Sequence, residues 1–278
     1  MKSSPVQLIP EIRSGQSLEL LKELHILTRD GRINQDSRRK LKQVYHLYQF
    51  IEPLLDDVLG RRGDLDLVDH GAGKSYLGFI LYDLFFKHRE AGHLYGIETR
   101  PELVSKSQEL AHRLGFGRMA FLNLTVERSI TDPVLPERID IVTALHACDT
   151  ATDDAIRFAL EKSAEHIVLV PCCQAEVAAV LRKHKGESLG LTPLSELWRH
   201  PIHTREFGSL VTNVLRCLLL EAHGYQVTVT ELVGWEHSMK NELIVATRKG
   251  ARKRSAGERA AKILESLNLE ELKGRFLY

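Results

Sequence analysis

The stretch 64-DLDLVDHGAGKSY-76 decides the fold of this chain. A short apolar run, residues 65–68, leads to Asp69, and a loop containing Gly71 and Gly73 follows it before a predicted helix. A strand, a glycine loop and a helix in this order present backbone N–H groups to a ligand at the carboxyl edge of a sheet. We therefore predict an α/β protein that binds a ligand at this loop.

The loop departs from two common nucleotide-binding patterns. A phosphate-binding P-loop needs a glycine five residues before Gly73, where Val68 stands, and Asp69 would repel a triphosphate. The nicotinamide fingerprint G-x-G-x-x-G has Tyr76 in place of its third glycine. An acid followed by G-x-G suits a ligand with a positive ammonium group and no phosphate. The alternative is that Asp69 caps the loop and the glycines form a plain turn.

A second predicted strand ends in an acid, Glu98, within the segment HLYGIETR. This acid and the pattern D-x-G-x-G together resemble the class I S-adenosylmethionine-dependent methyltransferases. The resemblance implies that S-adenosyl-L-methionine is the cofactor and that Glu98 accepts hydrogen bonds from its ribose hydroxyls. Residues after the third strand should lie near the adenine. The cofactor site implied in this way consists of Asp69, His70, Gly71, Ala72, Gly73, Glu98, Asn123, Leu124 and His146.

Strands and helices alternate from residue 64 onwards. We predict strands near residues 64–69, 93–98, 119–124, 138–146 and 166–171, and helices near 75–89, 101–114, 152–162 and 174–184. This alternation is typical of a parallel doubly wound sheet. Two final strands, residues 226–232 and 242–247, are joined too closely for a crossover helix and should be antiparallel. The expected fold is a Rossmann-like class I methyltransferase domain over residues 61–250, with a seven-stranded, mostly parallel sheet and an antiparallel terminal hairpin.

Helical segments flank this domain. Residues 1–60 form a predicted helical extension, in which Pro53 should bend or restart the second helix. Its first helix, over residues 17–28, would bury Leu18, Leu21, Leu24 and Leu27. Residues 251–278 contain a predicted amphipathic helix that begins with a capping box of Ser255 and Glu258.

The composition sets limits on partners and location. The chain has 278 residues, enough for one large α/β domain with an extension or for two small domains. The net charge of +1 predicts no partner, so any nucleic-acid site must be a local patch. Four cysteines have no disulfide-like spacing, and no secretory signal or apolar run of about 18 residues is present. We expect a soluble, cytoplasmic protein with reduced thiols and no membrane contact; its oligomeric state is left open.

Polar and thiol groups end the fourth and fifth predicted strands. The segments LHACDTATDD and VPCCQ place His146, Cys148, Asp149, Cys172, Cys173 and Gln174 there. Ligands of doubly wound sheets lie beyond the carboxyl ends of the strands, so these groups should converge beside the methyl donor. The predicted catalytic residues are His146, Asp149, Cys172 and Cys173.

Three kinds of chemistry fit this set of side chains. In the favoured one, His146 or Asp149 positions an oxygen or nitrogen nucleophile or takes its proton, and in-line placement does most of the catalysis. In the second, a cysteine attacks a cytosine before C5 methylation, although the Asp-Ala-Pro-Cys run of those enzymes is missing. The third, a metal bound by His146 and the cysteines, lacks paired C-x-x-C spacing, and we predict no metal. Alternatively, the cysteines are small buried apolar groups.

The segments HGAGKSYL, LHACDTATD, PCCQ and HSMKNEL, in this order, sharpen the resemblance. They are similar to a branch of the methyltransferases that includes the eukaryotic tRNA 2′-O-methyltransferases, over residues 38–248. The branch also contains methyltransferase domains whose substrates differ, so the resemblance implies the cofactor. Methyl transfer to RNA, with tRNA or rRNA as the acceptor, is the expectation that we favour. The zinc-binding Cys and His segments of those tRNA enzymes are absent. A protein or small-molecule acceptor, or a cofactor-binding interaction module without activity, remain the alternatives.

Two basic clusters are candidates for contact with an RNA backbone. Four cations, Arg38, Arg39, Lys40 and Lys42, lie in the first turns of the second predicted helix, where positive charge opposes the helix dipole. They form either a solvated face or an RNA-contacting face. The second cluster spans residues 248–254. The predicted substrate-binding residues are Arg38, Arg39, Lys42, Gln174, Lys240 and Asn241.

Overall fold

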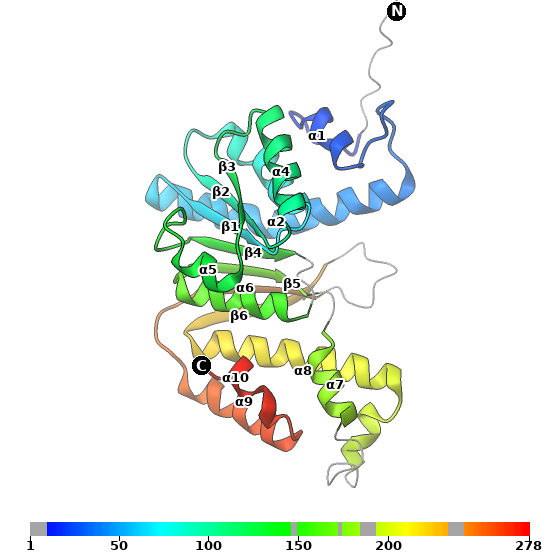
Figure 1. Ribbon diagram of the computed structural model, residues 1–278, viewed down its shortest axis with the longest axis vertical. Helices are drawn as coiled ribbons and strands as arrows, with labels where there is room; N and C mark the ends of the chain where they lie inside the picture. The colour runs from blue at the N-terminus through cyan, green and yellow to red at the C-terminus, as the bar shows by residue number, and fades with distance from the viewer. Residues whose placement is uncertain (1–9, 146–148, 172–173, 184–192, 233–241) are drawn as a thin grey trace, which may run out of the picture. The chain divides into compact units, whose positions relative to one another are not determined.

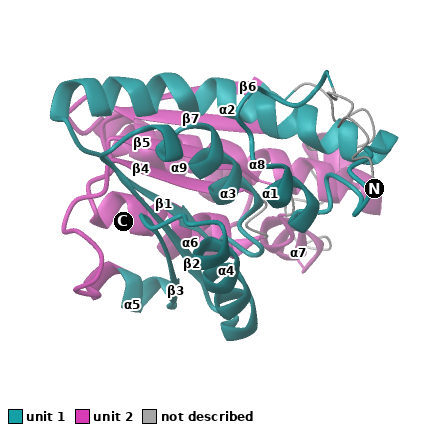
Figure 2. Ribbon diagram, turned by 90° about the horizontal axis from the view of Figure 1, so that it is seen from above, with its two compact units in different colours: residues 1–129, 231–241 teal, residues 130–230, 242–278 magenta. Residues whose placement is uncertain are grey.

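The computed structural model describes residues 10–145, 149–171, 174–183, 193–232 and 242–278 (Figure 1). The chain divides into two compact units. Residues 1–129 with 231–241 form the first unit, and residues 130–230 with 242–278 form the second (Figure 2). Among the described residues, no helix is both long enough and apolar enough to cross a membrane.

The described strands form one seven-stranded sheet. Its strands are β1 (Asp66–His70), β2 (His93–Glu98), β3 (Met119–Asn123), β4 (Ile141–Leu145), β5 (His166–Val170), β6 (Tyr225–Glu231) and β7 (Glu242–Arg248). Their order is β3-β2-β1-β4-β5-β7-β6. In the first unit β1, β2 and β3 pair in parallel; in the second, β4 and β5 are parallel and β7 is antiparallel to β5. The predicted Rossmann-like, mostly parallel fold is confirmed.

Helices connect and flank the strands. The α-helices of the described residues are α1 (Leu18–Glu23), α2 (Gln35–Arg62), α3 (Tyr76–Leu84), α4 (Pro101–Arg113), α5 (Val126–Thr131), α6 (Thr150–Glu161), α7 (Glu176–Lys183), α8 (Pro201–Ala222), α9 (Arg254–Ser266) and α10 (Lys273–Phe276). Short 3-10 helices are η1 (Phe86–His88), η3 (Pro193–Trp198) and η4 (Glu270–Leu272). Every side chain of β5 is buried, as expected of a strand covered on both faces.

The N-terminal segment is fastened to α3 within the first unit. The buried carboxylate of Asp83 accepts hydrogen bonds from the Ser17 amide (2.9 Å) and from Lys87 Nζ (2.8 Å). The helix predicted over residues 17–28 is wrong in length, because α1 ends at Glu23 and His25 has a left-handed φ of 55°. Its predicted apolar face is wrong at Leu18, which is 40% exposed.

The second helix is continuous through the proline at which a bend or a restart was predicted. Helix α2 runs over 28 residues with Pro53 inside it, so the predicted restart at this proline is wrong. The proline costs a helix interior about 3 kcal/mol, which the buried stripe of α2 outweighs. Asn34 caps its start by accepting a hydrogen bond from the Ser37 amide at 2.8 Å, and Gly63 ends it with a φ of 74°.

A helical layer in the second unit packs α7, α8 and α9 around one apolar core. Figure 1 shows α8 in yellow beside α9 in orange. The core includes Leu215 of α8 and Ala260 and Leu264 of α9, so the predicted amphipathic C-terminal helix has the expected buried face. The predicted capping box is wrong, because α9 begins at Arg254 and its cap residue, Lys253, makes no side-chain cap.

Candidate cofactor site

The glycine loop after β1 is fastened to the end of β2. The Ala72 amide donates to the Ile97 carbonyl at 2.9 Å, and the Gly73 amide donates to Glu98 Oε2 at 2.8 Å. Gly71 and Gly73 have φ values of 69° and 58°, in the left-handed region that glycine enters without strain. The predicted strand-loop-helix arrangement is therefore present, with its backbone held against a buried carboxylate.

Glu98 is the most strongly held acid of this loop. Only 6% of it is exposed, and its carboxylate accepts hydrogen bonds from the Arg100 amide, from Arg100 Nε and Nη2, and from the Gly73 amide, at 2.8–3.1 Å. Burial by itself raises the pKa of Glu98, but the hydrogen bonds from Arg100 and Gly73 outweigh it and lower the pKa to about 2. The side chain is a pure acceptor at physiological pH.

The neighbouring strand β3 contributes Asn123, which lies opposite Glu98 in the register. Asn123 Nδ2 donates to the Glu98 carbonyl at 3.0 Å, so the amide ties the two strand ends together. Beneath the loop, a Cβ on Gly96 would lie 2.5 Å from the Phe121 ring. Only glycine at residue 96 lets that ring pack below the loop.

The two residues at the end of β1 are also buried. Asp69 is 2% exposed. Its carboxylate accepts a long hydrogen bond of 3.5 Å from the hydroxyl of Ser75, which is the residue before α3. Burial lowers the pKa of His70 to about 4, although the charge of Glu98 opposes that shift. His70 is therefore neutral at pH 7, whereas Glu98 is ionised.

The buried His70 should make the stability of the protein depend on pH. An unfolded histidine has a pKa of about 6.5, so below that pH protons bind the unfolded chain preferentially. The free energy of unfolding should fall by about 3 kcal/mol as the pH drops from about 6.5 to about 4. Denaturant titrations of wild type and His70→Gln across this range check it. The variant should lose that part of the slope; equal slopes in both proteins would contradict the assignment.

The residues of this site fit S-adenosyl-L-methionine. The buried, ionised carboxylate of Glu98 could accept hydrogen bonds from two ribose hydroxyls if they replaced the Arg100 guanidinium, which supplies two of its present donors. The charge of Glu98 disfavours a phosphate and favours a cationic ligand.

Two predicted site residues of the second unit bind other protein groups. Asp149 Oδ1 accepts from the amides of Ala175 (3.0 Å) and Glu176 (3.4 Å), so its carboxylate caps the start of α7. Gln174 is buried, with Nε2 donating to Asn213 Oδ1 at 3.3 Å. Direct roles of these two side chains in catalysis or substrate binding stay predictions.

The remaining predicted residues divide into two groups. In α2, Arg38 forms an ion pair with Glu11, Arg39 Nη1 lies 3.9 Å from Asp36 Oδ1, and Lys42 is exposed. The others lie outside the described residues: His146, Cys148, Cys172, Cys173, Lys240 and Asn241.

Sequence reasoning missed Arg100 and Arg216. Arg100 lies two residues after Glu98 and supplies three of its hydrogen bonds. Arg216 is fully buried in α8, and its signal in the sequence is a single charge within the apolar run LVTNVLRCLLL. Both are cations whose role depends on an acid elsewhere in the fold.

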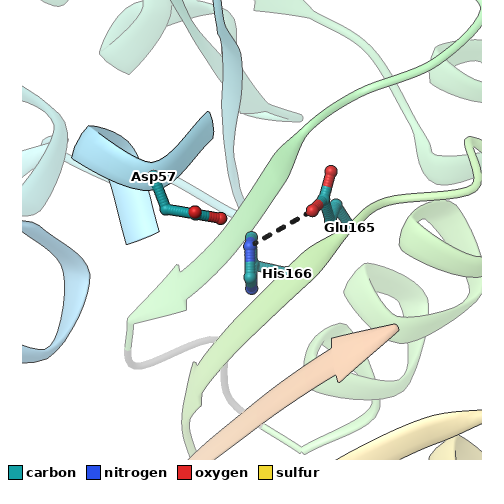
Figure 3. Close-up of side chains that lie close together, drawn as sticks. All are labelled: Asp57, Glu165 and His166. Atoms are coloured by element: carbon teal, nitrogen blue, oxygen red, sulfur yellow. Dashed lines mark ion pairs between the residues drawn. The ribbon is translucent and has the colours of Figure 1, made fainter. Parts of the chain in front are cut away.

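A further pair of titratable groups lies at the amino end of β5. Figure 3 shows His166 beside Glu165, with Nε2 3.8 Å from Oε1. His166 Nδ1 lies 3.1 Å from the hydroxyl of Thr247, the residue opposite it in β7. The contact between His166 and Thr247 links β5 to β7. It lies at the amino end of β5, whereas Gln174 follows the carboxyl end of that strand.

Comparison with known proteins decides the family. A family model described as a methyltransferase domain matches residues 39–180, half of the chain. The chain belongs to this methyltransferase family. Its fold and family make it an S-adenosyl-L-methionine-dependent enzyme. A search of curated proteins found no match for this methyltransferase.

Several solved structures are similar to this methyltransferase at low sequence identity. Magnesium protoporphyrin IX methyltransferase from Synechocystis PCC 6803 is 15% identical, with a TM-score of 0.46 over 83% of this chain and 93% of that one. An rRNA methylase from Streptococcus thermophilus is 12% identical, with a TM-score of 0.40 over 66% and 87%. The fibrillarin pre-rRNA processing protein of Methanococcus jannaschii is 12% identical, with a TM-score of 0.41 over 68% of each chain.

Proposed function

We propose that this methyltransferase modifies RNA, with tRNA or rRNA as the acceptor. The observation that carries the proposal is the basic face at the start of α2, where Arg38, Arg39 and Lys42 lie within two turns. Arg38 and Lys42 are four residues apart and share a face of the helix. Cations at a helix N-terminus oppose its dipole. Glu11 and Asp36 offset part of that cost through Arg38 and Arg39, and phosphate groups of an RNA strand would offset more of it.

The cofactor side of the proposal uses residues of the first unit. Glu98 accepts hydrogen bonds from the ribose hydroxyls, and the backbone of the loop from His70 through Gly71, Ala72 and Gly73 faces the cofactor. Asp69 would lie near its cationic groups, and Asn123 and Leu124 would lie toward its adenine. When bound, the cofactor supplies a methyl group on a sulfonium.

The acceptor side uses the segments that follow β4 and β5. His146 is our proposed acceptor of the proton from the nucleophile. The carboxylate of Asp149 caps α7. Its role in this scheme is to connect the chain after β4 to the start of α7. Cys172 and Cys173 form no covalent intermediate in this scheme. A single cysteine-to-alanine change that stopped turnover while cofactor binding persisted would instead favour cytosine C5 chemistry.

Neutralising the basic face should weaken RNA binding and its salt dependence. Each phosphate contact to a single strand contributes about 0.7 to the slope of log K against the logarithm of salt concentration. The double variant Arg39→Gln and Lys42→Gln should therefore flatten the slope by about 1.4. Arg38 is left unchanged because it pairs with Glu11. The measurement is binding of total tRNA over a range of salt concentrations.

A matched control removes the same charge from the other end of α2. Arg61→Gln with Arg62→Gln also takes away two cations, so it tests whether net charge alone explains the effect. S-Adenosylhomocysteine affinity should be unchanged in both double variants. Equal slopes of log K against the logarithm of salt concentration for wild type and the Arg39, Lys42 variant would show that this face does not contact RNA. The support for an RNA acceptor would then be lost.

A further inference from the structure

Arg216, in the middle of α8, is a fully buried cation with an unusually complete set of partners. Its exposed fraction is 0%. The guanidinium forms a bidentate ion pair with Asp153, with Nε 2.7 Å from Oδ1 and Nη2 2.8 Å from Oδ2. Buried ion pairs of this kind add little stability compared with apolar side chains of the same volume. The presence of this ion pair in an apolar helix therefore indicates that Arg216 orients neighbouring groups.

The second partner of Arg216 is the backbone just beyond β4. Nη2 donates to the Asp149 carbonyl at 2.8 Å. Asp149 has φ 50° and ψ −119°, a backbone conformation that side-chain-bearing residues rarely adopt and that persists only when its surroundings enforce it. Arg216 thus holds a strained peptide in place, and the ion pair with Asp153, in the first turn of α6, keeps the guanidinium aimed at it.

From Arg216 the polar contacts extend to the segment beyond β5. Nη1 donates to Asn213 Oδ1 at 3.1 Å, and the same oxygen accepts from Gln174 Nε2 at 3.3 Å. Asn213 Nδ2 donates to Glu242 Oε2 at 2.6 Å, at the start of β7. The side chain of Asp149 closes the network by capping α7. One face of α8 therefore fixes residues at the carboxyl ends of β4 and β5 and at the start of β7.

We propose that Arg216 is a positioning residue for methyl transfer. Ligands of doubly wound sheets lie beyond the carboxyl ends of the parallel strands, where Asp149 and Gln174 lie. Arg216 acts through them: it fixes the Asp149 peptide directly and Gln174 through Asn213. The inference rests on the enzyme being a methyltransferase and is independent of whether its acceptor is RNA.

Arg216→Lys tests the proposal because it keeps the positive charge and removes the planar guanidinium with its several N–H donors. A lysine ammonium can pair with Asp153, but it lacks the planar donors that hold Asp153 and the Asp149 carbonyl together. The rate of label incorporation from saturating S-adenosylmethionine into total cell lysate should fall about 100-fold, the loss expected when reacting groups are misplaced by about 1 Å. S-Adenosylhomocysteine affinity should stay within about twofold of wild type, because Glu98 and its loop belong to the first unit.

A second variant separates positioning from folding. Arg216→Met with Asp153→Leu removes both charges, a change that buried pairs often tolerate without loss of stability. This double variant should also bind S-adenosylhomocysteine normally and transfer methyl groups slowly. Wild-type turnover in either variant would overturn the proposal. Loss of cofactor binding and of the folded state in both variants would also overturn it, since the network would then be structural only. The lysate contains protein as well as RNA acceptors. The comparison of label incorporation by wild type and variants can therefore be interpreted even if the acceptor is not RNA.

Discussion

Replacing Glu98 with alanine is expected to weaken the binding of S-adenosylhomocysteine by about 10- to 150-fold. That loss corresponds to about 1.5–3 kcal/mol, the usual contribution of a hydrogen bond to a charged group. Glu98 stays ionised because its pKa is about 2, so the loss should be constant across neutral and mildly acidic pH. Asp69→Ala should cause a loss of the same order by removing the second buried carboxylate. Isothermal titration calorimetry measures both.

The matched control is Glu102→Ala. Glu102 is an exposed acid in the first turn of α4, four residues after Glu98, so its removal changes net charge equally without touching the loop. Its affinity should equal that of wild type. Unchanged affinity in both Glu98→Ala and Asp69→Ala would contradict the placement of the cofactor on this loop.

The largest effect on stability is expected for Asp153→Ala. The change leaves Arg216 buried without its ion-pair partner, and breaking a buried pair in this way costs about 3–5 kcal/mol. The control is Glu258→Ala, which breaks the exposed pair between Arg254 and Glu258 and should change the free energy of unfolding by less than about 1 kcal/mol. Urea titrations of the three proteins provide the comparison. A loss below about 1 kcal/mol for Asp153→Ala would show that water or another group compensates the guanidinium.

The parts of the fold that were predicted correctly depend on local patterns. The alternation of apolar strands and helices predicted the sheet, and the D-x-G-x-G loop with Glu98 predicted the end of β1 and the end of β2.

The errors have physical reasons in tertiary packing. The capping box of Ser255 and Glu258 has a valid local pattern, but the cap residue of α9 is Lys253, two residues before Ser255. Pro53 should restart a helix in isolation, yet the long buried stripe of α2 carries the helix through it. Leu18 has helical spacing with Leu21, but the chain turns at His25 and leaves Leu18 exposed.

The sequence predicted which residues lie at the strand ends of the candidate site, but it did not predict which residues they contact. Its residues at strand ends follow from the sheet rule, so Asp149 and Gln174 could be named. The partners of Arg216 are Asp153, 63 residues earlier, and Asp149, 67 residues earlier. Contacts between residues so far apart in the chain produce no periodic pattern in the sequence. The sequence therefore showed a charged residue in an apolar helix, but it did not identify the partners of that residue.

One measurement tests the central claim most directly. The protein is incubated with cell lysate and S-adenosylmethionine labelled on its methyl group, and the labelled material is then divided between ribonuclease and protease. We predict that ribonuclease releases the label, that protease leaves it in place, and that Glu98→Ala lowers the amount of label incorporated. Label that resists ribonuclease and is released by protease would contradict methyl transfer to RNA.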